Sequence, residues 1–260
     1  MIDYCHTFLL DASGVLYNEN GVIPQAVATV RRMQARGAVF VVTNNSCHSP
    51  AVISAALAHD GYQLPADHIF SSGYGLSEDP DIAASLRGKT VFFVGYEDSK
   101  VYMQSTGYAG FASLAQADVI VISSSIGAAA EEMVVRVKAA LVHRPRPVIC
   151  CNPDHYVRGL GQDLIPVAGY YAAQIEAAGF PVHWIGKPLE NYSQMIARRL
   201  KARGVNLDAG VCFFDDNPVN VMNMQMHLGI SGCWIRETGI GFAFDPTLIH
   251  TTYRADVLDL

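Results

Sequence analysis

The chain has 260 residues, of which 50% are hydrophobic and 16% are charged, and its formal net charge is -6. This length allows one large α/β domain or two smaller ones, and the composition excludes general disorder. The charges are spread thinly, without the basic cluster that nucleic acid or an anionic membrane would attract. The sequence contains no apolar stretch of bilayer-spanning length, and its start lacks a basic signal-peptide region. We therefore expect a soluble, cytoplasmic protein with no nucleic-acid and no membrane partner.

Short apolar runs alternate with segments of helical spacing along the whole chain. The runs predict strands at residues 7–10, 38–43, 69–71, 90–94, 119–123, 148–151, 182–185, 211–214 and 232–235. The helical segments are residues 25–35, 50–60, 128–141, 167–178, 192–203 and 218–228. Strands that alternate with helices form parallel sheets covered by helices on both faces. The fold class is therefore α/β, and this number of strands fits two sheets better than one.

Polar residues cluster where several of these strands end. The clusters are residues 11–14, 43–46 and 215–217, and a fourth candidate is the segment 186–188. In an open parallel sheet, ligands bind at the carboxyl ends of the strands. The four segments are far apart in the sequence, but we expect them to meet at one edge of a sheet.

The residue types in these segments are those that phosphoryl transfer to a carboxylate requires. The reaction needs a nucleophile, hydrogen-bond donors for the phosphoryl oxygens, a cation, and hard oxygen ligands for a divalent metal. The chain offers Asp11, the pair Thr43 and Asn44, Lys187, and the pair Asp215 and Asp216. Each of them alone is more simply a turn residue, a loop residue or a helix cap. Their combination at strand ends favours phosphoryl transfer.

These segments resemble the haloacid dehalogenase superfamily. The resemblance rests on residues 8–16, 41–46, 186–188, and 213–216 followed by Asn220. The long gap between Thr43 and Lys187 is similar to the NagD-like or para-nitrophenyl phosphatase branch, and residues 70–75 and 151–154 are similar to its cap. The resemblance implies a doubly wound, Rossmann-like parallel-sheet core. This core comprises residues 1–75 and 181–260, and an inserted α/β cap domain comprises residues 76–180.

The resemblance also implies roles for individual residues. Asp11 attacks phosphorus and binds Mg²⁺ together with the backbone carbonyl of Ser13 and the carboxylate of Asp216. Asp215 stands where many relatives have glycine, so it either holds a metal-bound water or adds a ligand. The remaining catalytic and phosphate-binding positions are Thr43, Asn44, Asn45 and Lys187. Three cap residues follow a predicted strand and either face the substrate or form a surface loop: Asp154, His155 and Arg158.

Ser13 is a departure from the pattern that the resemblance implies. Phosphatases of this superfamily usually have at this position a second aspartate, which protonates the leaving group and then activates water. A serine hydroxyl has no useful pKa for this work near neutrality. The leading expectation is a Mg²⁺-dependent phosphatase that hydrolyses a small phosphate monoester through an aspartyl-phosphate. The alternatives are a phosphotransferase or other chemistry of the superfamily, and a non-catalytic phospholigand-binding protein. Caps of this type often pair, which leaves a homodimer open.

Overall fold

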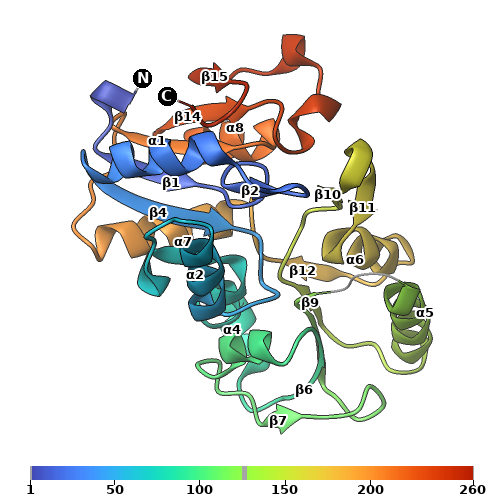
Figure 1. The fold of residues 1–260 in the computed structure, drawn as a ribbon. Helices are drawn as coiled ribbons and strands as arrows, with labels where there is room; N and C mark the ends of the chain where they lie inside the picture. The colour runs from blue at the N-terminus through green and yellow to red at the C-terminus, as the bar shows by residue number, and fades with distance from the viewer. Residues whose placement is uncertain (1, 125–127, 260) are drawn as a thin grey trace.

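The computed structural model of the protein describes residues 2–124 and 128–259, and two parallel sheets dominate it (Figure 1). The larger sheet has six strands in the order β15-β14-β13-β1-β4-β5. From one edge to the other these strands are Tyr253–Ala255, Ser231–Ile235, Val211–Asp215, Thr7–Leu10, Ala38–Thr43 and Ile69–Ser71. β1 lies in the centre between β13 and β4, and all four of its residues are buried. Such continuous apolar strands are typical of a sheet that is covered on both faces.

Helices cover both faces of the larger sheet. The apolar side chains of α1 and α2 pack with Phe8 and Leu10 of β1 on one face. Those of α7 and α8 pack with Leu9 on the opposite face. The bounds of these helices are Pro24–Gln34 for α1, Pro50–His59 for α2, Glu190–Lys201 for α7 and Pro218–Leu228 for α8. Successive residues of a strand point to opposite faces, so β1 anchors both layers.

The smaller sheet has five parallel strands in the order β12-β9-β8-β6-β7. From one edge to the other they are Val182–Trp184, Val148–Cys150, Val119–Ile122, Thr90–Val94 and Gly110–Phe111. One face packs on α5 (Ala128–His143) and α6 (Ala168–Ala177). The other face, through Val121 and Ile149, joins the same apolar cluster as α7. The two sheets therefore share a continuous hydrophobic cluster.

Hydrogen bonds also connect the two sheets. The hydroxyls of Ser46 and Ser123 each donate to the other's backbone carbonyl, at 2.7 and 2.6 Å. The hydroxyl of Ser72 contacts the carbonyls of Asn44 and Cys151. These five positions lie just after strands, so the carboxyl ends of strands in the two sheets lie against each other.

The predicted strands and helices are all present, and the parallel α/β class is confirmed. The strand at residues 182–185, which we placed in the core segment from residue 181, instead pairs with β9 in the smaller sheet. The sequence analysis did not predict β15, the short helices α3 (Gly75–Glu78) and α4 (Pro80–Leu86), or two hairpins. The hairpins are β2–β3 (Tyr17–Asn18 and Gly21–Val22) and β10–β11 (Tyr156–Arg158 and Leu164–Pro166).

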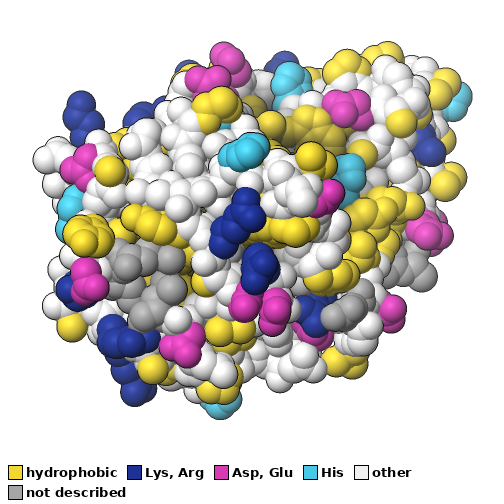
Figure 2. Space-filling view, turned by 90° about the horizontal axis from the view of Figure 1, so that it is seen from above, with side chains coloured by type: hydrophobic (Ala, Val, Ile, Leu, Met, Phe, Trp, Pro, Cys, Tyr) yellow, Lys and Arg dark blue, Asp and Glu magenta, His cyan; other side chains and the backbone are white. Residues whose placement is uncertain are grey.

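The molecular surface agrees with the thin spread of charge in the sequence. Acidic and basic side chains are interspersed on the face drawn in Figure 2, which shows no continuous field of lysine and arginine. Within the described residues, every helix is too short or too polar to cross a bilayer.

Candidate active site

Asp11 lies at the carboxyl end of β1, where the central strand leaves the larger sheet. Its N–H donates to the carbonyl of Phe214 at 2.8 Å, which continues the ladder between β1 and β13 and fixes the backbone. The turn that follows requires Gly14, whose φ is +83°. A Cβ atom there would lie 2.5 Å from a carboxylate oxygen of Asp216. Glycine therefore lets the turn after Asp11 pass against Asp216.

Lys187 is buried between two carboxylates. Its Nζ lies 2.8 Å from Oδ1 of Asp11 and 2.6 Å from Oδ2 of Asp215, and its side chain is only 1% exposed. Burial opposes its charge, but the carboxylates of Asp11, Asp215 and Asp154 outweigh burial and raise the pKa of Lys187. Burial raises the pKa of Asp11 to about 6, and Lys187 acts in the opposite direction. The ammonium thus favours the ionised form of Asp11, which a nucleophile needs.

Asn44 holds the lysine segment in place. Its Nδ2 donates to the carbonyl of Lys187 at 3.0 Å, and its Oδ1 accepts from the N–H of Lys187 at 2.8 Å. Gly186, at φ +131°, allows this approach, since a Cβ there would lie 2.6 Å from Oδ1 of Asn44. The Asn44 side chain therefore positions Lys187. The expected contact of Asn44 with a phosphoryl group stays a prediction.

Asp215 anchors Lys187 from the end of β13. Besides Lys187, it accepts from the N–H of Asn217 at 2.8 Å and from the amide of Asn220 at 3.2 and 3.3 Å. Burial raises its pKa, and Lys187 opposes this shift. Both oxygens of this carboxylate thus already have protein partners, which favours an anchoring role over that of a principal metal ligand.

The neighbouring carboxylates form a donor set that fits a hard divalent cation. Oxygen atoms of Asp11, Asp215 and Asp216 lie within 4.8 Å of one another. Burial, followed by the charges of Asp215 and Asp11, raises the pKa of Asp216 well above its usual value. Oδ2 of Asp216 accepts from the N–H of Ile240 at 2.6 Å, which orients this carboxylate. Clustered, mutually repelling oxygen ligands are what Mg²⁺ would bind and neutralise.

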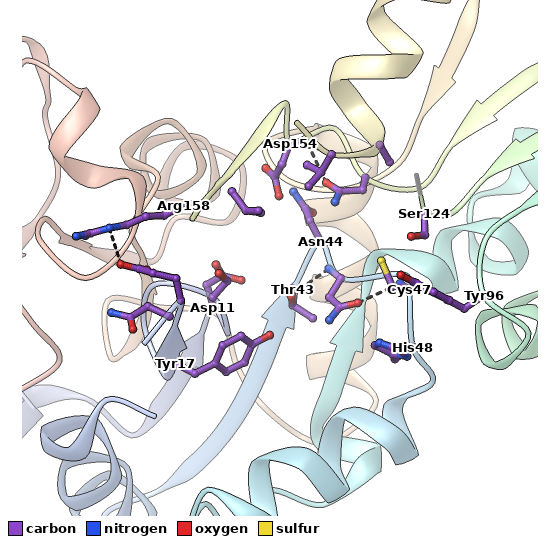
Figure 3. A pocket seen from close by; sticks show the side chains of 18 residues that line it. Asp11, Tyr17, Thr43, Asn44, Cys47, His48, Tyr96, Ser124, Asp154 and Arg158 are labelled. Carbon is purple, nitrogen blue, oxygen red and sulfur yellow. Dashed lines mark hydrogen bonds and ion pairs between the residues drawn. The ribbon is translucent and has the colours of Figure 1, made fainter. Parts of the chain in front are cut away.

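Asp11 opens onto a cavity of about 390 Å³ between the two sheets, a size typical of sites for small ligands (Figure 3). Six other predicted site residues line it with Asp11, from both sides: Ser13, Thr43, Asn44, Asn45, Asp154 and Arg158. Thr43 is buried at the end of β4, and its Oγ1 accepts from the N–H of Asn45 at 3.1 Å. The structure therefore brings the three strand ends of the larger sheet together with a loop of the smaller sheet.

Of the two remaining predicted cap residues, Arg158 lines the cavity and His155 does not. Arg158 has its Nε 3.0 Å from Oε1 of Glu19, and its Nη1 donates to the carbonyl of Glu237 at 2.6 Å. His155 is exposed and lines a separate depression with Pro188. The structure thus places His155 outside the cavity that holds Asp11. Substrate binding by either residue stays a prediction.

The comparisons with known proteins agree with this arrangement. The sequence profile described as haloacid dehalogenase-like hydrolase matches residues 8–109, which include Asp11 and Thr43. A solved structure from Cytophaga hutchinsonii, described as a possible sugar phosphatase of the haloacid dehalogenase superfamily, superposes with a TM-score of 0.85. The match covers 100% of this chain and 96% of that chain at 20% identity. The chain is thus similar to haloacid dehalogenase-like proteins, in the sequence of residues 8–109 and in its fold.

Two other proteins are similar to this chain. NagD from E. coli K-12 has the same fold, with a TM-score of 0.74 and 17% identity over 98% of this chain and 97% of that chain. A dihydroxyacetone phosphatase from Corynebacterium glutamicum (strain R) is 27% identical over 185 residues. That alignment covers 70% of this chain but only 64% of the relative's length.

Several residues that line the cavity were not predicted from the sequence. Tyr17 and Glu19 come from the β2–β3 hairpin, and Asn152 comes from the loop after β9. The two-residue strands of the hairpin gave no periodic signal. Asn152 stands in a segment that the resemblance had marked, because it precedes Pro153 and Asp154.

Proposed function

We propose that this protein is a Mg²⁺-dependent phosphatase that hydrolyses a small phosphate monoester through an aspartyl-phosphate at Asp11. The observation that carries the proposal is the buried Lys187, which pairs with Asp11 beside Asp216, where Asp11 opens onto a small cavity. With these roles, a nucleophile, a fixed cation and a metal donor set would lie at one point, which supports the proposal. The NagD-like fold and the relative named as a dihydroxyacetone phosphatase support the same class of substrate.

The chain's own groups divide the work of the reaction. An oxygen of Asp11 attacks phosphorus, and the ammonium of Lys187 neutralises charge beside it. Thr43 and the backbone of the following residues supply donors to the phosphoryl oxygens. Asp11, the carbonyl of Ser13 and Asp216 would hold Mg²⁺, while Asp215 keeps Lys187 in place. When bound, the ion would supply electrostatic stabilisation of the transferring phosphoryl group.

We also propose that the segment carrying the smaller sheet acts as a cap over the site. Its loop after β9 and its β10–β11 hairpin contribute Asp154 and Arg158 to the cavity. Residues from this segment would contact the leaving group, because Asp11 and Lys187 occupy the phosphoryl side. Substrate selection would then depend on the cap.

The test compares wild type with Asp11→Asn on a panel of p-nitrophenyl phosphate, dihydroxyacetone phosphate and propyl phosphate. We expect Mg²⁺-dependent phosphate release by wild type, loss upon chelation, and at least a 10³-fold lower rate in the variant, since an amide is no nucleophile. Radiolabelled phosphate should remain on Asp11 of wild type after rapid acid quenching. Turnover that survives in Asp11→Asn would contradict the proposal. A protein that binds phosphate esters without turnover would instead be the non-catalytic alternative.

A further inference from the structure

The proposed reaction needs a proton at two moments. When the bond between phosphorus and the ester oxygen breaks, an alkyl leaving group would depart as a strongly basic alkoxide unless a proton reaches it. When water then attacks the aspartyl-phosphate, a base must remove a proton from that water. One carboxyl group that faces the leaving group is able to do both, first as an acid and then as a base.

Most described polar groups lining the cavity are unsuited to this work. The Ser13 hydroxyl does not ionise near neutrality. Burial raises the pKa of Tyr17 to about 12 and also raises the pKa of Cys47. His48 lies next to Asp98, with Nδ1 3.8 Å from Oδ2, and stacks on Tyr96. These groups are either too weakly acidic or turned toward other partners.

The remaining acidic side chains of the described lining are two carboxylates besides Asp11. Glu19 is paired with the guanidinium of Arg158, and only 6% of its side chain is exposed. The guanidinium of Arg158 therefore already engages this carboxylate. Asp154 is not ion-paired with any described residue. Asp154 is thus the carboxyl group of the lining that is free to gain and lose a proton.

The loop that carries Asp154 is fixed from several sides. Its N–H donates to Oδ1 of Asn152 at 2.8 Å. The start of α6 packs so closely that a Cβ on Gly169 would lie 2.5 Å from the carbonyl oxygen of Asp154. A Cβ on Gly186 would likewise lie 2.5 Å from Cδ of Pro153. The loop therefore rests directly on the segment that carries Lys187.

This packing directs the Asp154 side chain into the cavity. Figure 3 shows it entering from the side opposite Asp11 and Thr43, and pointing toward Asn44. The charged groups that face it across the cavity are Lys187 and Asp11. An ester whose phosphorus lies at Asp11 would extend its leaving group toward this side. Asp154 is thus placed where the proton is needed.

We propose that Asp154 is the general acid and base of the phosphatase reaction, an inference that rests on the function proposed above. In the first step, an oxygen of Asp11 bonds to phosphorus, and the ester bond breaks with its electron pair on the leaving oxygen. The carboxyl group of Asp154 gives its proton to that oxygen, and the alcohol departs. In the second step, water attacks phosphorus, its proton passes to the carboxylate of Asp154, and the bond to Asp11 breaks. The products are an alcohol and phosphate, and both carboxyl groups are restored.

The titration of Asp154 agrees with this role. Burial raises its pKa to about 6, Lys187 acts in the opposite direction, and the Asp11 carboxylate adds to the rise. A pKa near neutrality leaves a useful fraction of both the acid and the base form. Since the first step uses the acid form, kcat/KM for an alkyl phosphate should fall about tenfold per pH unit above about 6.

The experiment measures kcat/KM and pre-steady-state bursts for wild type, Asp154→Asn and a control, Asp163→Asn. The control changes an exposed aspartate of the β10–β11 hairpin in the same way. For the best alkyl phosphate of the panel, we expect Asp154→Asn to lower kcat/KM about 10²- to 10⁴-fold. For p-nitrophenyl phosphate, whose leaving group hardly needs a proton, the loss should stay within about tenfold. That variant should release a burst of nitrophenolate and accumulate phosphorylated Asp11.

The comparison of leaving groups separates this role from a structural one. A misplaced loop or a lost binding contact would lower kcat/KM for both esters by similar factors and would produce no burst. This result would overturn the proposal. The proposal would also be overturned if kcat/KM of wild type fell equally for both esters as the pH rises above about 6. A wild type that forms no phosphorylated Asp11 with either ester would instead overturn the proposed function, and this inference with it.

Discussion

Lys187 is the cation that neutralises the buried carboxylates of the site. Its ammonium lies within 2.8 Å of Asp11 and within 2.6 Å of Asp215, and all three side chains are buried or nearly so. A buried charge that loses its partner is costly, because the interior solvates it poorly. The amide pair of Asn44 and the turn at Gly186 both keep the backbone of Lys187 in place. The positions that surround this lysine therefore serve its placement.

Replacing Lys187 by methionine should abolish turnover and also destabilise the fold. We expect the free energy of unfolding at pH 8 to fall by about 3 to 5 kcal/mol, because two buried carboxylates lose their cation. At pH 5 the loss should be smaller, since both carboxyl groups then take up protons. Urea unfolding at the two pH values measures this difference.

The control for this prediction is Asp215→Asn, alone and combined with Lys187→Met. The double variant has one fewer unpaired carboxylate, so its loss should be smaller than the sum of the two single losses. Losses that add, or a Lys187→Met variant as stable as wild type at pH 8, would show that the ion pairs contribute little.

At the level of elements, the sequence predicts long apolar segments well and short ones poorly. Strand β4 is a β-branched and apolar run, and α2 begins at Ser49 and Pro50, which cap and start it as expected. The β2–β3 and β10–β11 hairpins consist of strands of two or three residues, too short for a periodic pattern. The pairing of β12 with β9 depends on tertiary contacts, which no local signal in residues 182–184 reveals.

The candidate site shows the same division. The sequence was sufficient to predict the site residues that end or follow apolar strands, which are Asp11, Thr43 and Asp216. It was also sufficient to predict Lys187, which lies in the segment 186–188. Their meeting at one sheet edge follows from parallel strand geometry. The reciprocal hydrogen bonds of Asn44 with Lys187 join residues 143 positions apart in the chain, so no local pattern in the sequence indicates them.

The two hairpins that the sequence missed are joined by one side chain. Arg158 of β10 lies against Glu19 of the β2–β3 hairpin and donates to the carbonyls of Glu237 and Gly239, which follow β14. The labels β2 and β10 lie next to each other in Figure 1. Arg158 thus ties the β10–β11 hairpin to the β2–β3 hairpin and to the segment that follows β14.

Replacing Arg158 by alanine should loosen this junction. Glu19 would keep a buried carboxylate without its cation, so we expect the free energy of unfolding to fall by about 3 kcal/mol or more. Combining it with Glu19→Gln removes that charge and should recover part of the loss. Denaturant unfolding of wild type, the single variants and the double variant completes a double-mutant cycle, which measures the coupling free energy between Arg158 and Glu19. An Arg158→Ala protein that loses less than about 0.5 kcal/mol would show that the junction is held by other contacts.

At the level of the whole molecule, the cavity lies where the two sheets meet, and groups from both are needed to complete it. Strands β1 and β13 of the larger sheet position the carboxylates, whereas the segments that follow β9 and β12 of the smaller sheet carry Asp154, Arg158 and Lys187. The shared apolar cluster and the paired hydroxyls of Ser46 and Ser123 connect the sheets directly behind the cavity. Ligands at the cavity should therefore affect the stability of the entire chain, not of one sheet alone.

Mg²⁺ should stabilise the protein, and this effect should depend on pH. Burial raises the pKa of Asp11 to about 6 and, together with Asp215 and Asp11, that of Asp216 well above its usual value. A carboxyl group whose pKa is higher in the folded state contributes stability below its unfolded pKa and loses it as pH rises through the folded pKa. The metal-free cluster should therefore become more costly between about pH 4 and pH 7. Mg²⁺ binds the ionised carboxylates, so it should offset this cost only above about pH 6.

Thermal unfolding at pH 5 and pH 8, each with a chelator or with one fixed Mg²⁺ concentration of about 100 times the dissociation constant at pH 8, measures this linkage. At pH 8 such a concentration contributes about 2.7 kcal/mol, which corresponds to a rise in Tm of about 5 to 10 °C for a chain of this size. At pH 5 the rise should be nearly absent, because protons occupy the carboxylates. Asp216→Asn is the matched control, since it removes one ligand and should abolish the rise at pH 8. An equal rise at both pH values, or a rise that persists in Asp216→Asn, would place the bound Mg²⁺ away from the Asp11 and Asp216 carboxylates.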